Sequence, residues 1–154
     1  DEVLLKPGRL SADERARMEH HPLLAAEILR PIRGTEEIAR IVEAHHECPD
    51  GSGYPYGLKD GQIPLQALVL SVADVYSALT TSRPYKPAMA SDQAMEVLQR
   101  MAGSKLDAVS VKVLQQLLRA GLWPTEAMID PLSRKAMHSR ALISLPSAQP
   151  VVPA

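Results

Sequence analysis

Aromatic residues are scarce in this sequence, which has no phenylalanine, one tryptophan and four tyrosines among its 154 residues. Strands favour aromatic and β-branched side chains in an alternating apolar and polar pattern, and no segment sustains that alternation. Hydrophobic residues still make up 45% of the chain, which is enough to bury a core. We therefore expect a globular, all-α protein.

Cysteine, net positive charge and long apolar runs are also minimal or missing. The single cysteine, Cys48, excludes an internal disulfide framework and favours a reducing cytoplasm. A formal net charge of -1 excludes a global basic field for DNA, so an anionic ligand would need a local site. No signal peptide and no apolar run of membrane length occur. The sequence therefore predicts a soluble, cytoplasmic chain whose length suits one domain.

Capping residues and proline predict the first two helices. Ser11 and Glu14 form a capping box for a helix that ends near His20. Pro22 disfavours helical geometry at the residue before it. The same proline can open a second helix that runs to about Arg30.

Four further helices are expected. Thr35 is predicted to cap the third. By the i, i+3, i+4, i+7 spacing, the buried face of this helix carries Ile38, Ile41, Val42 and His45. After a loop at 47–63, residues 65–81 are apolar nearly all round, which predicts a central buried helix. Ser91 and Asp107 are predicted to cap the last two.

The helical pattern weakens towards the C-terminus. Residues 125–142 carry the spacing of one or two helices, and the last ten residues, with three prolines, are typical of a disordered tail. We therefore expect a domain over residues 1–120 and a C-terminal extension over 121–154.

Two adjacent histidines at the end of the third predicted helix are the first candidates for chemistry. Neighbouring helix residues point about 100° apart, so His45 and His46 can serve two nearby metal ions, or one ion and a substrate oxygen. The alternative is a buried histidine bonded to a backbone carbonyl, beside a solvated one. His21, placed at a helix junction by the proline that follows it, is a third imidazole.

A carboxylate in an apolar helix adds to this group. Asp74 lies in the middle of the predicted 65–81 helix, where an aspartate needs a partner. A carboxylate near imidazoles suits iron or manganese. The alternative is a structural aspartate in a salt bridge.

Two loops complete the candidates. The first, Asp50-Gly51-Ser52-Gly53-Tyr54-Pro55, combines glycines that permit close backbone approach with a rigid tyrosine ring and a proline. In the second, Arg83 and Lys86 place two cations just after the predicted 65–81 helix. Guanidinium and ammonium groups bind phosphate, and the alternative is a solvated basic loop.

The order of these motifs resembles the HD-GYP family, bacterial metal-dependent phosphodiesterases of the HD superfamily. The resemblance covers residues 1 to about 119. The stretches that carry it are His21-Pro22, Ala44-His45-His46-Glu47, Asp50-Gly51-Ser52-Gly53-Tyr54-Pro55, Val72-Ala73-Asp74-Val75-Tyr76 and Arg83-Pro84-Tyr85-Lys86.

The resemblance implies an all-helical fold that hydrolyses cyclic di-GMP to pGpG or GMP with two or three iron or manganese ions. By resemblance, the metal ligands are His21, His45, His46 and Asp74. The substrate-binding residues are Arg83, Lys86, Tyr54, Gly53 and Pro55. Diguanylate cyclase domains are an implied partner, through the Gly-Tyr-Pro loop.

The sequence departs from the family in one respect. The earlier ligands of the family, among them the His-Asp pair whose aspartate bridges two metals, have no counterpart here. We therefore expect an HD-domain-like helical bundle that lacks its first helices, holds at most one metal weakly, and is weak or inactive as this fragment. Uncovered apolar surface favours association, for example as a homodimer, or instability.

Two alternatives to a phosphodiesterase stay open. One is a non-catalytic regulatory module that binds cyclic di-GMP or a partner domain. The other is an HD-type hydrolase of another nucleotide, against which the Gly-Tyr-Pro run argues.

Overall fold

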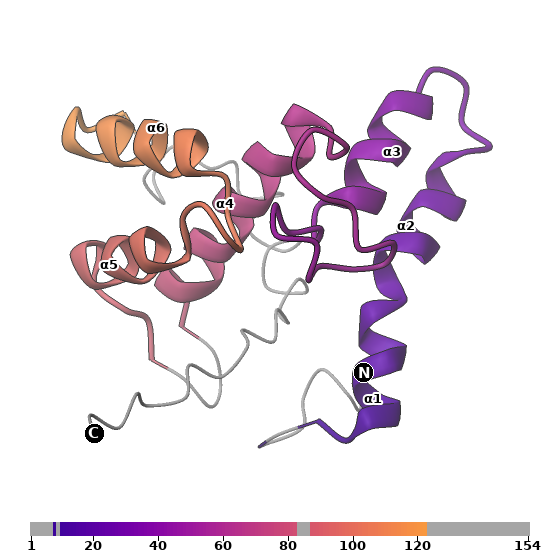
Figure 1. Cartoon of the computed structure of the whole chain (residues 1–154), viewed down its shortest axis with the longest axis horizontal. Coiled ribbons are helices and arrows are strands. Elements are labelled where there is room, and N and C mark those ends of the chain that lie inside the picture. Colours follow the sequence, from indigo (N-terminus) through magenta and orange to yellow (C-terminus); the bar gives the residue numbers. More distant parts are fainter. Residues whose placement is uncertain (1–7, 9, 83–86, 123–154) are drawn as a thin grey trace.

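The computed structural model describes residues 8, 10–82 and 87–122. These residues form six helices and no strand, and none of the helices is long and apolar enough to cross a membrane. The helices are α1 (Ala12–Glu19), α2 (His21–Leu29), α3 (Glu36–Ala44), α4 (Leu65–Thr80), α5 (Ser91–Met101) and α6 (Ala108–Arg119). The expected all-α class is confirmed. α4 runs between the α2–α3 pair and the α5–α6 pair (Figure 1).

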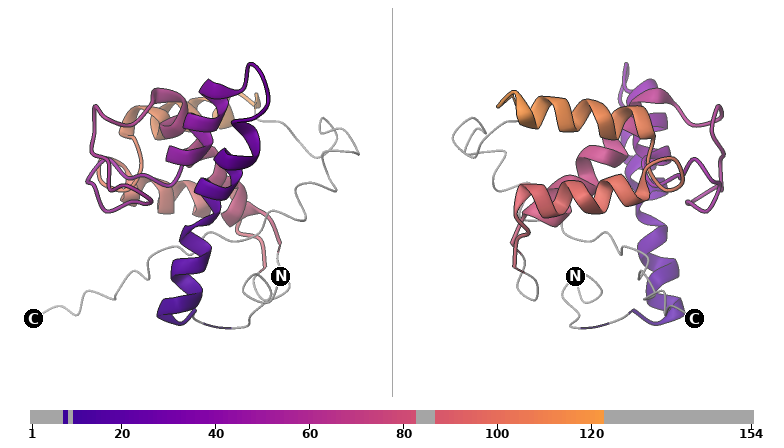
Figure 2. Two further views of the ribbon diagram at one scale, coloured as in Figure 1. Left: turned by 90° about the vertical axis from the view of Figure 1, so that its right-hand side faces the viewer. Right: turned by 60° about the vertical axis from the view of Figure 1, so that its left-hand side comes forward.

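Helices α1 and α2 follow each other with only His20 between them. Ser11 and Glu14 make the predicted capping box, because the Glu14 N–H donates to Ser11 Oγ and the Ser11 N–H donates to Glu14 Oε2. Pro22 lies in the first turn of α2, where its missing N–H costs no helical hydrogen bond. α1 projects away from the other helices in both views of Figure 2. The junction therefore places His21 where the compact part of the bundle begins.

Thr35 and Ser91 were predicted to cap helices with their hydroxyls, and for both the role of the hydroxyl was wrong. Thr35 occupies the N-cap position of α3, but its hydroxyl donates to the carbonyl oxygen of Leu29 at 2.6 Å and does not cap the helix. Ser91 is the first residue of α5, not its cap, and its hydroxyl pairs with that of Tyr76 at 2.9 Å. Asp107 caps α6 as predicted. The Thr35 hydroxyl instead bonds to the end of α2 and to the turn after it, and the Ser91 hydroxyl joins α5 to α4.

The buried face of α3 also differs from the predicted one. Ile38 is 50% exposed, whereas Ala39 and Glu43 are buried. Glu43 is buried because its carboxylate is paired. It accepts hydrogen bonds from Arg30 Nη2 at 2.7 and 2.9 Å and from the Tyr56 hydroxyl at 2.7 Å. Apolar spacing alone cannot anticipate a carboxylate on the inner face of a helix.

α4 joins two clusters of buried side chains, in agreement with its predicted central position. The larger cluster lies between α4, α5 and α6 and contains Val72, Val75, Tyr76, Leu79, Ala94, Met95, Leu98, Leu106, Val111 and Leu114. The smaller cluster lies where α3, the 47–63 loop and α4 meet and contains Ala44, Ile63, Ala67 and Leu68. Burial is not all round, because Leu65 is 67% exposed and Val69 is 51% exposed. The central helix thus keeps one open apolar face.

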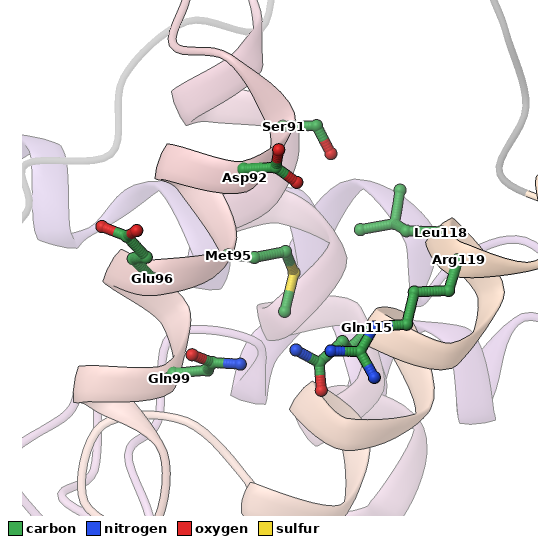
Figure 3. Close-up of a pocket in the computed structure, with 8 residues that line it drawn as sticks. All are labelled: Ser91, Asp92, Met95, Glu96, Gln99, Gln115, Leu118 and Arg119. Carbon is green, nitrogen blue, oxygen red and sulfur yellow. The ribbon is translucent and has the colours of Figure 1, made fainter.

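Two hollows flank α6. One, of about 260 Å³, is lined almost entirely by apolar side chains of α4 and α6, namely Leu65, Val69, Val72, Ala73, Val109, Val113, Leu114 and Leu117, with Ser110. The other, of about 280 Å³, lies between α5 and α6, with Asp92 and Glu96 on the α5 wall and Arg119 on the α6 wall (Figure 3). Within the described part of the chain, neither lining includes a residue that we predicted to be functional.

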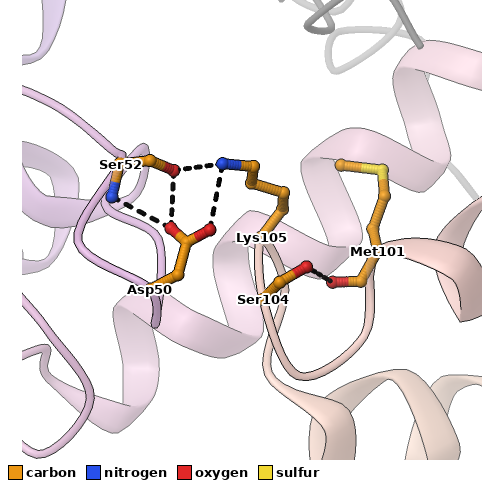
Figure 4. Close-up of polar contacts among 5 residues, drawn as sticks. All are labelled: Asp50, Ser52, Met101, Ser104 and Lys105. Atoms are coloured by element: carbon orange, nitrogen blue, oxygen red, sulfur yellow. Dashed lines mark hydrogen bonds and ion pairs between the residues drawn. The ribbon is translucent and has the colours of Figure 1, made fainter. Parts of the chain in front are cut away.

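Polar contacts fasten the 47–63 loop to the α5–α6 turn (Figure 4). Lys105 Nζ lies 3.0 Å from Asp50 Oδ2 and also contacts the Ser52 hydroxyl. The Asp50 N–H donates to the Ser104 carbonyl oxygen at 3.0 Å. Hydrogen bonds from the Ser52 side chain and N–H, together with Lys105, hold the pKa of Asp50 at about 2, although partial burial opposes them. Asp50 is therefore charged at neutral pH and anchors the loop.

The same loop presses a glycine against the end of α3. A Cβ at Gly53 would lie 2.3 Å from the backbone N of Cys48 and 2.5 Å from Glu47 Cα. These are backbone atoms that cannot rotate away, so the position accepts only glycine. The Tyr54 N–H donates to the His46 carbonyl oxygen at 3.2 Å, which holds the next loop residue against the same stretch.

We predict that Gly53→Ala destabilises the chain by roughly 2–3 kcal/mol, because the methyl group forces two backbone segments apart. The free energy of unfolding in urea measures this loss. Gly61→Ala is the matched control, since Gly61 has a φ of +82° but nothing within 4 Å of its Cβ position. Its cost is backbone strain alone, roughly 1 kcal/mol. Equal losses in the two variants would show that Gly53 is not tightly packed.

We predict that the Asp50 carboxylate contributes stability that depends on pH. Its pKa is lowered from an ordinary value of 3.8 to about 2, so its contribution is complete above about pH 4 and is lost as pH falls through 2. The difference in unfolding free energy between the native chain and Asp50→Asn should therefore shrink between pH 4 and pH 2. Because the ion pair is solvent-screened, we expect at most about 1 kcal/mol. A difference that stays constant over this range contradicts the prediction.

Candidate metal centre

Three histidines from two helix ends meet in the structure. His21 is the first residue of α2, His45 is the C-cap residue of α3, and His46 follows it. One ring nitrogen from each lies within 4.8 Å of the others, and all three side chains are half-buried. The ring centroids of His21 and His46 are 4.9 Å apart, and those of His45 and His46 are 3.9 Å apart. Residues 21, 45 and 46 therefore share one site, which we call the histidine cluster.

Backbone carbonyls orient two of the imidazoles. His21 Nδ1 lies 2.7 Å from the Met18 carbonyl oxygen, and His45 Nδ1 lies 2.5 Å from that of Val42. A carbonyl oxygen only accepts hydrogen bonds, so Nδ1 must carry the proton in both rings. Nε2 of each ring is then the atom left to bind a metal, in the arrangement usual for histidine ligands.

The third imidazole is held neutral. Burial, together with the nearby charges of His45 and His21, lowers the pKa of His46 to about 2. A neutral ring offers a lone pair to a metal at neutral pH. His46 Nε2 lies 3.2 Å from His21 Nε2. Two nitrogens bound to one ion at about 2.1 Å are about 3.0–3.4 Å apart, so this pair fits a shared metal.

Tyr54 covers one side of the histidine cluster. Its ring centroid lies 4.9 Å from that of His46, with the rings inclined by 33°. Burial raises the pKa of the Tyr54 hydroxyl, and the negative charges of Glu19 and Asp74 raise it further. Tyr54 therefore stays protonated and can donate a hydrogen bond at the edge of the site.

The fourth predicted ligand is placed differently. Asp74 is half-buried on α4, and its charge acts on the Tyr54 hydroxyl. Its oxygens are not in the group of ligand atoms that lie within 4.8 Å of one another. The structure thus brings together three of the four predicted ligands.

The predicted substrate-binding residues are divided in the same way. Tyr54 lies against the cluster, while Gly53 is packed on the backbone of Glu47 and Cys48. Pro55 follows through a cis peptide bond and is half-buried. Arg83 and Lys86 lie outside the described residues.

Two buried glutamates are functional candidates that sequence reasoning did not single out. Glu47 is 1% exposed and accepts the backbone N–H groups of Tyr56 at 2.7 Å and Leu58 at 2.8 Å. Glu43 accepts the Tyr56 hydroxyl and Arg30. The sequence feature that could have identified them is their spacing of four residues, which places both carboxylates on one side of the helix end.

The cluster suits metal chemistry better than covalent catalysis. Three imidazoles on fixed helix ends form a ligand set for a divalent ion. The nearby thiol of Cys48 has a pKa that burial raises, so it lacks the thiolate character of a nucleophile.

Comparison with known proteins places the chain in a family. The sequence matches the HD domain family over residues 1–109. It is 44% identical over 116 residues to the cyclic di-GMP phosphodiesterase response regulator RpfG of Xanthomonas campestris, covering 74% of this chain and 31% of that protein. It is 38% identical over 107 residues to a cyclic di-GMP phosphodiesterase of Thermotoga maritima, covering 67% of this chain and 28% of that one. The chain thus spans about a third or less of the length of these relatives.

A solved structure supports the same assignment of the fold. The crystal structure of the cyclic GMP-AMP specific phosphodiesterase V-cGAP3 of V. cholerae matches with a TM-score of 0.61 and 21% identity, over 83% of this chain and 30% of that one. The resemblance first read from the His-His-Glu and Gly-Tyr-Pro motifs is confirmed. This chain belongs to the HD domain family and is of the HD-GYP type.

Proposed function

We propose that this chain forms part of a metal-dependent phosphodiesterase that hydrolyses cyclic di-GMP to pGpG or GMP. The observation that carries the proposal is the cluster of His21, His45 and His46, with their ring nitrogens within 4.8 Å of one another. Relatives named as cyclic di-GMP phosphodiesterases supply the substrate class. The protein would act in the cytoplasm.

His21, His45 and His46 would hold one divalent ion, with Asp74 as a further ligand. Imidazoles together with a carboxylate favour iron or manganese, and the complete domain would hold two to three ions. When bound, the metal supplies a Lewis acid that offsets negative charge on the phosphodiester.

The other residues of the chain would bind and orient the substrate. The Tyr54 ring shields His46 from water, and its protonated hydroxyl is a donor for a phosphate or base oxygen. Gly53 and Pro55 fix the position of this ring. Arg83 and Lys86 would pair with phosphate oxygens of the substrate. The support for these two residues comes from the sequence alone. Diguanylate cyclase domains and a second copy of the chain are proposed partners.

One observation favours a second candidate, a module that binds cyclic di-GMP or a partner without cleaving it. Among the described residues, the cluster contains three imidazoles and no carboxylate. A bridging carboxylate helps to hold two ions together. A site without one would hold a single ion and act as a receptor.

We predict that the purified chain binds manganese or iron(II) and that His46→Ala weakens this affinity at least about 100-fold, since even the loss of a partner that orients a ligand costs 10–100-fold. Elemental analysis and calorimetry measure the change. His20→Ala is the matched control, because His20 is exposed and outside the cluster. Equal metal content in the two variants would refute the assignment of the ligands.

We predict that the natural gene product carrying this sequence converts cyclic di-GMP to linear products in the presence of manganese or iron(II). His46→Ala should abolish turnover and His20→Ala should leave it unchanged, as chromatography of the nucleotides would show. A metal-loaded protein that binds cyclic di-GMP but does not cleave it would establish the receptor instead. No binding and no turnover would reject both.

A further inference from the structure

We infer that Glu47 and Glu43 form a paired carboxylate clamp that positions the Tyr54 ring over the histidine cluster. Neither residue belongs to the group of metal-ligating atoms. Both act through the backbone and side chain of the loop that follows Tyr54. They are therefore positioning residues.

Glu47 is the inner half of the clamp. At 1% exposure its carboxylate is shielded from water, so each oxygen needs a hydrogen-bond donor inside the protein. The Tyr56 N–H donates to Oε1 at 2.7 Å and the Leu58 N–H donates to Oε2 at 2.8 Å. Two alternate backbone groups of the loop are thus bound to one rigid carboxylate, which fixes both the position and the direction of the chain.

Glu43 is the outer half of the clamp. It lies four residues earlier, one helical turn away, and accepts the Tyr56 hydroxyl at 2.7 Å. Arg30, the C-cap residue of α2, donates to both Glu43 oxygens, which balances the charge of the buried carboxylate. Tyr56 is therefore held at both ends, its N–H by Glu47 and its hydroxyl by Glu43.

The clamp bears on the metal site through a short path. Glu47 directly follows the proposed metal ligand His46, and Tyr56 is two residues after Tyr54. The Glu47 carboxylate therefore links His46 to the loop that carries the Tyr54 ring. Gly53 presses the start of that loop on Glu47 and Cys48. With the two sides of Tyr54 fixed in this way, its ring centroid lies 4.9 Å from that of His46.

The test is Glu47→Gln in the full chain. A glutamine has one acceptor oxygen and one NH₂ group, so one of the two loop N–H groups would face another donor. Glu37→Gln is the matched control, because it removes the same charge from an exposed position on α3. We expect the Tyr56 and Leu58 amides to exchange with solvent at least about tenfold faster in Glu47→Gln, and no change in Glu37→Gln.

A second readout reports the ring contact itself. Because the two ring centroids lie 4.9 Å apart, the ring current of Tyr54 should shift the NMR resonances of the His46 ring protons in the native chain. Tyr54→Leu removes that shift and calibrates it. Glu47→Gln should move the same resonances towards their positions in Tyr54→Leu while metal content stays unchanged. A folded Glu47→Gln protein with native amide exchange and native His46 resonances overturns the proposal.

If Glu47→Gln does not fold, Tyr56→Phe tests the clamp from its exposed side. This change removes only the hydroxyl that Glu43 binds. Exchange of the Leu58 amide should rise several-fold, and an unchanged rate overturns the role of Glu43.

The effect on substrate rests on the proposed function. In the natural gene product, Glu47→Gln should raise KM for cyclic di-GMP ten- to a hundredfold with a smaller change in kcat. The reason is that the Tyr54 ring, which would contact the substrate, is displaced while the metal ligands stay in place. Failure of the proposed function leaves no turnover in the native protein, whereas failure of the clamp leaves KM unchanged and the NMR signals native.

Discussion

The site depends on carbonyl oxygens at helix ends that accept hydrogen bonds from histidine side chains. The last carbonyls of a helix have no partner within it, and here those of Met18 in α1 and Val42 in α3 accept from the Nδ1 atoms of His21 and His45. The His21 ring is thereby turned so that its Nε2 lies 3.2 Å from His46 Nε2. Because α2 begins where α3 ends, two such helix ends supply a ligand set without any loop to order it.

The loop after α3 closes this arrangement by a different physical device. Within the described residues it has one isolated bridge, between Asp50 and Lys59, and a few turns. Other backbone groups of the loop bond to Glu47 and to the residues just after α3. Gly53 allows contact with Glu47 that no side chain would permit. Lys105 and Asp50 attach the same loop to the α5–α6 turn. A covering segment without secondary structure is therefore fixed from three directions.

Local signals predicted the helices well and their distant partners poorly. The Ser11 capping box and the Asp107 cap lie within four residues of their partners, so the sequence alone identified them. The hydroxyls of Thr35 and Ser91 were misassigned because their partners belong to other helices. Glu47 stood inside a motif that we had noted, yet its role depends on backbone N–H groups nine and eleven residues away. Burial and pairing, not residue type, decide such roles.

The electrostatic environment of the histidine cluster is set by the charged side chains that lie near it. Imidazoles add no negative charge to a metal site, so an ion held by His21, His45 and His46 would keep more of its positive charge than one held by carboxylates alone. Negative charge comes instead from Glu19 and Asp74, whose effect is felt at the Tyr54 hydroxyl. The Tyr54 ring packs against His46 on one side, and its hydroxyl lies in the field of Glu19, Asp74 and Arg15. The contacts that hold this ring come from the loop and from Glu43 and Glu47, not from the metal-ligating atoms, so the position of the ring and the capture of a metal depend on different residues.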